Sequence, residues 1–183
     1  MSEWSHPGGK LIEIGPASLT DEELLAILIG SGYKGRTAQE IAKELLNKYH
    51  SIAGLLGKTF EDFPEIKGLK KGKMARIAAP FEMTKRIFNE NKWNLPNSRL
   101  VKLTLPEMSD TDILALLIGG RHKDKTAKDL AKEVLDKYKS ISGIMGQKLY
   151  DIAQIEGLGD VRVVRIAAAL EVVHRIAKAL ERE

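Results

Sequence analysis

The chain has 183 residues, of which 43% are hydrophobic, so it can form one medium-sized domain or two small ones with buried cores. The absence of cysteine excludes disulfides, thiolate metal sites and thiol catalysis, and it fits a reducing compartment. A formal net charge of +4 does not by itself indicate a nucleic-acid partner. The sequence shows neither a secretory signal nor an apolar run of the roughly 20 residues that cross a bilayer, so we expect a cytoplasmic protein with no membrane partner.

The first predicted helix opens on a capping box, in which Thr20 is followed three residues later by Glu23. Its apolar run ends at Gly30, a residue type that commonly follows the last helical turn. After a polar loop, the same pattern of Thr37 and Glu40 opens a second helix of about three turns.

Shorter segments complete this part of the chain. Two short helical segments are expected over residues 51–57 and 59–65, followed by a Gly-bearing turn and a long closing helix over 73–89. Pro80 lies inside the closing helix and is expected to kink it, or to break it near residue 79. No alternating strand pattern is found in the sequence, so the predicted fold is all-α.

The second part of the chain repeats the first at an offset of 89 residues. Residues 24–30 match residues 113–119, and Gly68-Leu69 returns as Gly157-Leu158. Ser109 before Asp112 repeats the first helix start, and Thr126 before Asp129 repeats the second. The direct interpretation is a tandem duplication of one helical domain. We therefore predict two domains, joined by a polar linker near their boundary, at residues 1–92 and 93–183.

Each predicted domain contains a turn with glycine at its corner, followed by a helix, over residues 66–77 and 155–166. Glycine at the corner lets backbone N–H groups face outward, and the next helix adds unpaired N–H groups and the positive end of its dipole. A phosphate group is the expected ligand. The alternative interpretation is an ordinary turn between packed helices.

Residues 15–49, 51–56 and 66–79 resemble, in that order, the amino-terminal domain of RadC-type proteins. The resemblance covers residues 10–87 and, through the repeat, residues 100–176. It implies a tandem helix-hairpin-helix module whose hairpins face DNA, with a role in DNA repair or recombination. RadC-type proteins also carry a metallo-hydrolase-like domain with a His-x-His motif. We expect that domain to be missing, because the four histidines of this sequence are isolated from one another.

The two turns depart from the family pattern, which has two glycines, in different ways. The first keeps Gly68 but has Lys70 at the second position, whereas the second keeps Gly157 and Gly159. The first turn is rich in lysine. The second is followed by Asp160, which is expected to cap the next helix and to compete with a phosphate group for its N–H groups.

The lysine-rich first turn is the strongest predicted binding site, because basic side chains beside a helix start neutralise phosphates without reading sequence. Ordinary solvated lysines are the alternative, here and in the polar loops. The resemblance also implies that hairpin carbonyl groups could hold a monovalent cation, and no other cofactor is expected. The predicted DNA-binding residues are Lys34, Gly35, Arg36, Lys67, Gly68, Lys70, Lys71, Gly72, Lys73, Lys123, Lys125, Gly157, Gly159 and Arg162.

We find no catalytic motif in the sequence and predict that the protein is not an enzyme. Glu171 and His174 have the helical spacing of a metal-binding pair, but no second pair exists, and both residue types suit a solvent face. A phosphate-binding loop ending in Gly-Lys-Ser/Thr and a context for a Ser-His-Asp triad are both missing.

The predicted function is therefore largely sequence-independent binding to the phosphate backbone of duplex or branched DNA by two linked domains. One alternative is a protein-interaction scaffold, which would expose apolar patches on its helices. Another is an accessory subunit that recruits a separate repair enzyme.

Overall fold

The structure is a computed structural model that describes residues 6–56, 58, 60–63, 65–91 and 108–181. The predicted domain boundary and most of the predicted linker lie outside these residues. Residues 6–91 contain α1 (Pro7–Ile14), η1 (Pro16–Ser18), α2 (Asp21–Ile29), α3 (Ala38–Tyr49), η2 (Ala53–Leu55), η3 (Phe60–Asp62) and α4 (Lys71–Glu90). Residues 108–181 contain α5 (Asp110–Ile118), β1 (Arg121–His122), β2 (Lys125–Thr126), α6 (Ala127–Tyr138), α7 (Ile141–Ile144), α8 (Leu149–Ala153) and α9 (Asp160–Leu180).

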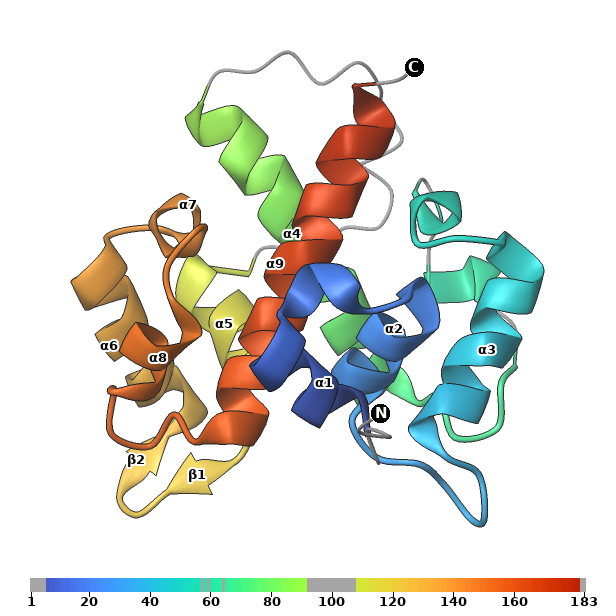
Figure 1. Ribbon diagram of the computed structural model, residues 1–183, viewed down its shortest axis with the longest axis horizontal. Coiled ribbons are helices and arrows are strands. Elements are labelled where there is room, and N and C mark those ends of the chain that lie inside the picture. The colour runs from blue at the N-terminus through green and yellow to red at the C-terminus, as the bar shows by residue number, and fades with distance from the viewer. Residues whose placement is uncertain (1–5, 57, 59, 64, 92–107, 182–183) are drawn as a thin grey trace.

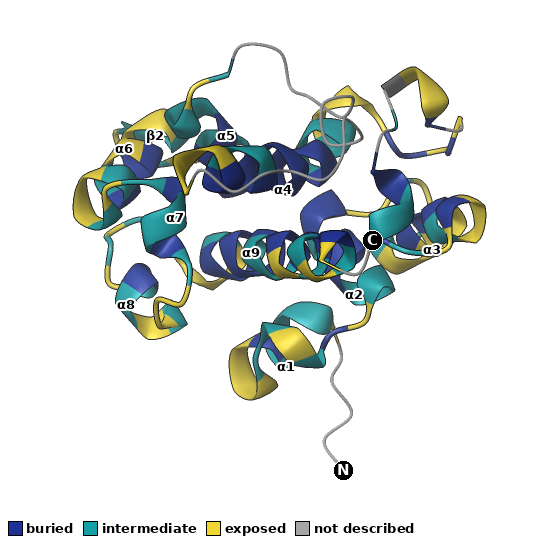
Figure 2. Cartoon of the chain, turned by 90° about the horizontal axis from the view of Figure 1, so that it is seen from above, coloured by how far each residue is buried: buried dark blue, intermediate teal, exposed yellow. Residues whose placement is uncertain are grey.

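The two longest helices, α4 and α9, cross at the centre of the molecule (Figure 1). Seen from above, they lie side by side, with α5 to α8 at one end and α2 and α3 at the other (Figure 2). Both helices pack against α2 and also against α5. The buried hydrophobic side chains of residues 6–91 and 108–181, called here the first and second halves, form one cluster. Each long helix therefore contributes to the packing of both halves.

Each long helix carries one arginine that binds the first residue of a helix in the opposite half. Arg175 on α9 donates a hydrogen bond to Asp21 Oδ1 at 2.7 Å, and Arg86 on α4 forms an ion pair with Asp110. Each arginine also pairs with a glutamate one turn earlier on its own helix. The members of the two pairs differ by 89 positions, so the contact is reciprocal, as across a two-fold interface.

The capping residues read from the sequence are confirmed. Thr20, Thr37, Ser109 and Thr126 each accept a hydrogen bond from the backbone N–H three residues later, and the acidic side chain there bonds back to the cap. The helix α2 ends at Gly30, whose φ is 81°. Because these bonds join residues only three positions apart, the local sequence determines them.

Helix α1 was not predicted. It begins at Pro7, and the ring nitrogen Nδ1 of His6 accepts a hydrogen bond from the backbone N–H of Gly9 at 3.0 Å. Two consecutive glycines follow Pro7, and glycine disfavours helix interiors, so this segment carries weak local signals. Leu11 is fully buried and anchors the helix on the shared core.

Of the two outcomes expected at Pro80, the break near residue 79 is wrong, since α4 continues through it from Lys71 to Glu90, and the kink stays a prediction. Proline inside a helix costs about 3 kcal/mol. All eight side chains from Ile77 to Thr84 are buried, and the hydroxyl of Thr84 donates to the Pro80 carbonyl at 2.8 Å. Burial of the whole segment at the helix crossing offsets the loss at Pro80.

The polar loops fold into tight turns that the sequence analysis did not predict. In the second half β1 and β2 form a two-stranded antiparallel sheet in which His122 pairs with Lys125, and in the first half Tyr33 pairs with Arg36 at the equivalent place. Strands of two residues are too short for an alternating pattern. The described residues are otherwise helical or irregular, and none of their helices is long and apolar enough to span a lipid bilayer.

Candidate nucleic-acid interface

The turns predicted to bind phosphate lie at one end of the molecule. In Figure 1 the β1–β2 turn and the loop over residues 31–36 both reach the lower edge, and α9 begins between them. A Cβ atom on Gly68 would stand 2.7 Å from Cβ of Tyr33, and one on Gly157 would stand 3.3 Å from Cβ of His122. Each glycine corner therefore lies against the tight turn of its own half. We call residues 66–73 the first hairpin and residues 155–162 the second hairpin.

Gly68 and Gly157 are required by the backbone as well as by packing, since their φ angles are 98° and 99°. The second glycine of the family pattern has no such requirement. Gly159 has a φ of −68° and no atom within 4 Å of a Cβ placed there, and Gly72 in the first turn of α4 has the same open space. The absence of a second glycine in the first hairpin therefore does not change its corner.

The first half presents four exposed lysines around its hairpin: Lys34, Lys67, Lys70 and Lys71. Two of them approach the same ring, since Nζ of Lys34 and of Lys70 lie 5.5 and 5.8 Å from the ring centroid of Tyr33. Lys70 is the N-cap residue of α4, and the first turn of this helix contains no acidic residue. Among the described residues, no carboxylate forms an ion pair with any of the four. Gly35 supplies the second positive φ of the turn between Tyr33 and Arg36, at 81°.

Two further predicted cations of the first half bind protein groups instead. Arg36 forms an ion pair with Glu44 and donates to the carbonyl of Lys67 at 3.3 Å. Lys73 donates to the carbonyl of Ser31 at 2.6 Å. Both side chains join the hairpin to the neighbouring loop, so they position the four exposed lysines and contribute less free charge.

Two of the three predicted cations of the second half form ion pairs with carboxylates, and the third binds carbonyl groups. Lys123 pairs with Glu156 at 2.7 Å, and this contact lowers the pKa of the Glu156 carboxyl. Lys125 pairs with Glu133 at 2.8 Å, which raises the pKa of the lysine. Arg162 donates to carbonyl groups of the adjoining loops, among them that of Arg121 at 2.9 Å.

The prediction that Asp160 caps α9 is wrong. Gly159 occupies the N-cap position, Asp160 is the first helical residue, and no side chain caps this helix start. A residue with helical backbone angles cannot place its carboxylate over the first N–H groups as an N-cap residue does. Its negative charge nevertheless lies at the helix start. At equivalent positions the first hairpin has Lys67, Lys70 and Lys71, and the second has Glu156, Gly159 and Asp160.

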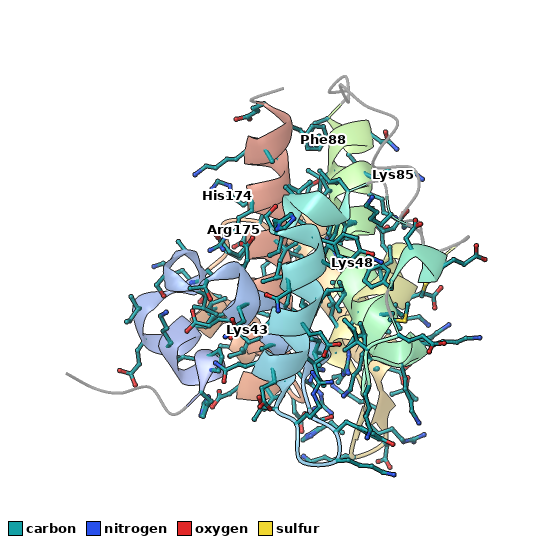
Figure 3. The ribbon with its side chains drawn as sticks, turned by 90° about the vertical axis from the view of Figure 1, so that its right-hand side faces the viewer. Lys43, Lys48, Lys85, Phe88, His174 and Arg175 are labelled. Atoms are coloured by element: carbon teal, nitrogen blue, oxygen red, sulfur yellow. The ribbon has the colours of Figure 1, made fainter. Side chains whose placement is uncertain are left out.

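Of the two residues with metal-binding spacing, Glu171 binds a protein group instead: its carboxylate accepts a hydrogen bond from Arg175 at 2.9 Å. His174 is exposed on the same helix, α9, where Figure 3 labels it beside Arg175. In the part of the chain that the structure describes, no three His, Cys, Asp or Glu residues are grouped so that they could hold a metal ion.

Sequence reasoning missed two half-buried arginines, Arg76 and Arg165, which lie in the second turns of α4 and α9. The available signal was an arginine at the same place in both halves, in a helical segment otherwise rich in Ile, Val and Ala.

Comparisons with known proteins place the chain in a family. The model of the UPF0758 N-terminal family matches residues 1–75 and again residues 89–164. A UPF0758 protein of Aliivibrio salmonicida is 44% identical over 90 residues, which are 49% of this chain and 40% of the relative. One of Clostridium beijerinckii is 33% identical over 135 residues, which are 74% of this chain and 55% of the relative.

The chain spans about half the length of the curated relatives that it matches. No solved structure matches it. Because the two matched segments together cover most of the sequence, the chain belongs to the UPF0758 N-terminal family.

Proposed function

We propose that this protein binds DNA without catalysing a reaction, and that its first hairpin contacts the phosphate backbone. The observation that carries the proposal is the group of exposed lysines, none of them ion-paired with a described carboxylate, around the Gly68 corner and the start of α4: Lys34, Lys67, Lys70 and Lys71. Positive charge and a helix start without a capping side chain favour an anionic ligand at the same place.

We also propose that the two halves are duplicated copies of one helix-hairpin-helix module. Three observations support the duplication: the family model matches twice, the glycine corners share their φ angles, and the Arg86 and Arg175 contacts are reciprocal. The two copies are unequal as binding sites, because the second hairpin carries Glu156 and Asp160.

Binding through such a surface is expected to depend on charge rather than base sequence. Lysines that neutralise phosphates release the counterions condensed on DNA, so affinity falls steeply with salt. Contacts to phosphates position the protein but do not distinguish base pairs. We infer that duplex and branched DNA of different sequences bind alike, and that a role in repair or recombination requires a partner enzyme for chemistry.

The test is a salt titration of binding to labelled duplex and branched DNA. Lys67, Lys70 and Lys71 are changed together to Gln, whereas Lys73 is kept because it holds the loop over residues 31–36. If each lysine contacts one phosphate, the slope of log affinity against log salt falls by about 2.7 for three contacts. The matched control changes three exposed lysines on α3, α6 and α9 to Gln, with the same loss of charge: Lys43, Lys132 and Lys178.

The control is expected to keep nearly the whole slope, because the removed charges lie away from the hairpin. Equal losses in both variants would reduce the effect to net charge and contradict a site at the first hairpin. Absence of binding by the unaltered protein at about 50 mM salt, where electrostatic affinity is strong, would reject the DNA proposal altogether.

A protein-interaction scaffold is the second candidate, and exposed apolar side chains favour it. Ile12 and Ile14 on α1 are 53% and 58% exposed, and Val161 at the start of α9 is 70% exposed. Ile12 and Val161 line the same cleft, described below. This candidate predicts that Ile12→Asp abolishes co-purification of a repair enzyme and leaves DNA affinity unchanged.

A further inference from the structure

A cleft lies where the first turns of α9 meet the first half of the molecule. It has two adjoining parts, with volumes of about 710 and 610 Å³. Four residues line both parts: Arg76, Asp160, Val161 and Arg165. Volumes of this size are typical of sites that hold small ligands.

The guanidinium groups of Arg76 and Arg165 converge in this cleft, although they come from different halves. Both groups lie close to Gly30, at the end of α2. A Cβ atom at Gly30 would stand 3.6 Å from Nη1 of Arg76 and 3.7 Å from Nη2 of Arg165. Glycine at this position leaves the space between the two groups open.

Both arginines are held in place by carbonyl groups at helix ends. Arg76 Nη2 donates to the carbonyl of Ile29 at 2.8 Å, at the end of α2. Arg165 Nη1 donates to the carbonyls of Leu117 and Ile118 at 2.7 and 3.3 Å, at the end of α5. These bonds fix the guanidinium planes, and they leave Nη1 of Arg76 and Nη2 of Arg165 without an acceptor among the described residues.

The carbonyl groups do not neutralise the positive charge that gathers here. A helix end contributes about half a negative charge, whereas the two arginines are joined by the equivalent cations Lys73 and Arg162. No described carboxylate forms an ion pair with any of the four. The buried Nε atoms of Arg76 and Arg165 have no hydrogen-bond partner in the described parts of the chain.

The electrostatic consequence is strongest at Arg165. Burial, together with the charges of Arg76 and Arg162, lowers the pKa of its guanidinium to about 10 from the ordinary 12.5. Burial also lowers the pKa of Arg76. A pKa lowered in this way means that the charged form is disfavoured, and a bound anion would relieve that cost.

We propose that this cleft binds a phosphate group between the guanidinium groups of Arg76 and Arg165. A guanidinium presents two parallel N–H donors that match two phosphate oxygens, and two such groups can hold one tetrahedral anion from different sides. The phosphate belongs either to the DNA backbone or to a small phosphorylated molecule. The site stands on its own geometry and does not require the hairpin lysines.

Inorganic pyrophosphate is the probe, and Val161 is the position to change. This side chain lines both parts of the cleft and is 70% exposed, so its replacement leaves the core intact. Val161→Glu places a competing carboxylate beside the arginines, and Val161→Gln is the neutral control of similar shape. Thermal unfolding of the full chain is followed with pyrophosphate and with sodium chloride at equal ionic strength.

We expect pyrophosphate at about ten times its Kd to raise Tm by about 3 to 6 °C in the unaltered protein and in Val161→Gln. Val161→Glu should show no rise beyond the chloride control. Asp160→Asn should bind pyrophosphate more tightly, because Asp160 is the carboxylate that lines the cleft. No rise in the unaltered protein, or an equal rise in Val161→Glu, would overturn the site.

Binding to duplex DNA identifies the source of the phosphate. If the DNA backbone supplies it, pyrophosphate competes with DNA, and Val161→Glu weakens DNA binding relative to Val161→Gln. If a small molecule supplies it, the two variants bind DNA alike. The variant lacking Lys67, Lys70 and Lys71 should keep its pyrophosphate response, so failure of the DNA proposal leaves this one standing.

Discussion

The first and second hairpins have the same corner and opposite charge. Their glycines adopt φ angles of 98° and 99° and lie against the neighbouring turn in the same way. Lys67 and Lys71 nevertheless stand where the second hairpin has Glu156 and Asp160. The shared backbone reflects what packing requires, and the side chains decide which ligand is attracted. A hairpin fold alone therefore does not establish DNA binding, and the charges have to be examined in each hairpin.

The largest effects are expected from alanine at the two corner glycines. The loss of stability should differ between them, because the corners have different neighbours. Gly68→Ala should lower the free energy of unfolding by about 3 kcal/mol, because it combines an unfavourable φ with a contact to Cβ of Tyr33, an atom close to the backbone. Gly157→Ala should cost about half as much, since its nearest neighbour is a terminal methyl of Leu130, which can move. Urea denaturation measures both.

Gly72→Ala is the control for these substitutions. Gly72 lies in the first turn of α4 with no atom near a Cβ placed there, so alanine should stabilise the protein by up to about 1 kcal/mol. Equal costs at Gly68 and Gly157 would mean that the backbone angle alone matters and that Tyr33 shifts freely.

The reciprocal arginines predict where the halves behave alike. Arg86→Ala and Arg175→Ala should each destabilise the protein by about 2 kcal/mol, which corresponds to a fall in Tm of about 4 to 8 °C. Each change leaves a carboxylate at least nine-tenths buried, Glu82 or Glu171, without its cation. Calorimetry should show a single transition, because both long helices belong to both halves.

Lys178→Ala provides the surface control on α9, with an expected change within about 0.5 kcal/mol. Two separate transitions in the arginine variants would contradict a shared core and favour halves that unfold independently.

Charge reversal at two positions should give the second hairpin the positive charge of the first. Glu156→Lys with Asp160→Lys should tighten DNA binding about tenfold and steepen the salt slope by about 1.8, for two new phosphate contacts. Electrophoretic or fluorescence titration at several salt concentrations measures both quantities. Glu13→Lys with Asp136→Lys gives the same charge change at exposed positions of α1 and α6. A similar gain in that control would assign the effect to net charge.

Local sequence predicted the elements that depend on neighbouring residues. Capping residues at Thr20, Thr37, Ser109 and Thr126 follow from side-chain bonds across three residues, and they mark the helix starts correctly. The stop at Gly30 is equally local. The lysine character of the first hairpin could also be read directly, because exposed charges need no tertiary partner.

Several features that sequence reasoning missed depend on distant contacts. Lys73 bonds a carbonyl 42 residues away, and Arg175 pairs with Asp21 at a separation of 154 residues. Helix α4 survives Pro80 only because it is buried at the crossing with α9. Arg76 and Arg165 likewise lie close together because α4 and α9 pack against each other. Hydrophobic periodicity and motif spacing report only on residues that are near in sequence. The packing of the two halves is therefore visible only in the structure.

The smallest predicted difference concerns the capping carboxylates Glu23 and Asp112. A hydrogen bond from Lys128, followed by bonds from Ser109, lowers the pKa of Asp112 to about 2 from 3.8. Burial raises the pKa of Glu23, but bonds from Lys10 and Thr20 outweigh it and leave that pKa lowered as well.

Both folded-state pKa values lie below the unfolded ones, so each carboxylate stabilises the protein above its unfolded pKa and loses that contribution as the pH falls through the folded value. For Asp112 the loss occurs between about pH 4 and 2. Carbon-detected NMR titration of the carboxyl groups measures this directly. Lys128→Gln should raise the pKa of Asp112 and leave Glu23 unchanged, and Lys10→Gln should do the reverse. An unchanged pKa of Asp112 in Lys128→Gln would mean that the hydrogen bonds of the cap cause the whole shift at this helix start, whereas Glu23 depends on Lys10 as well.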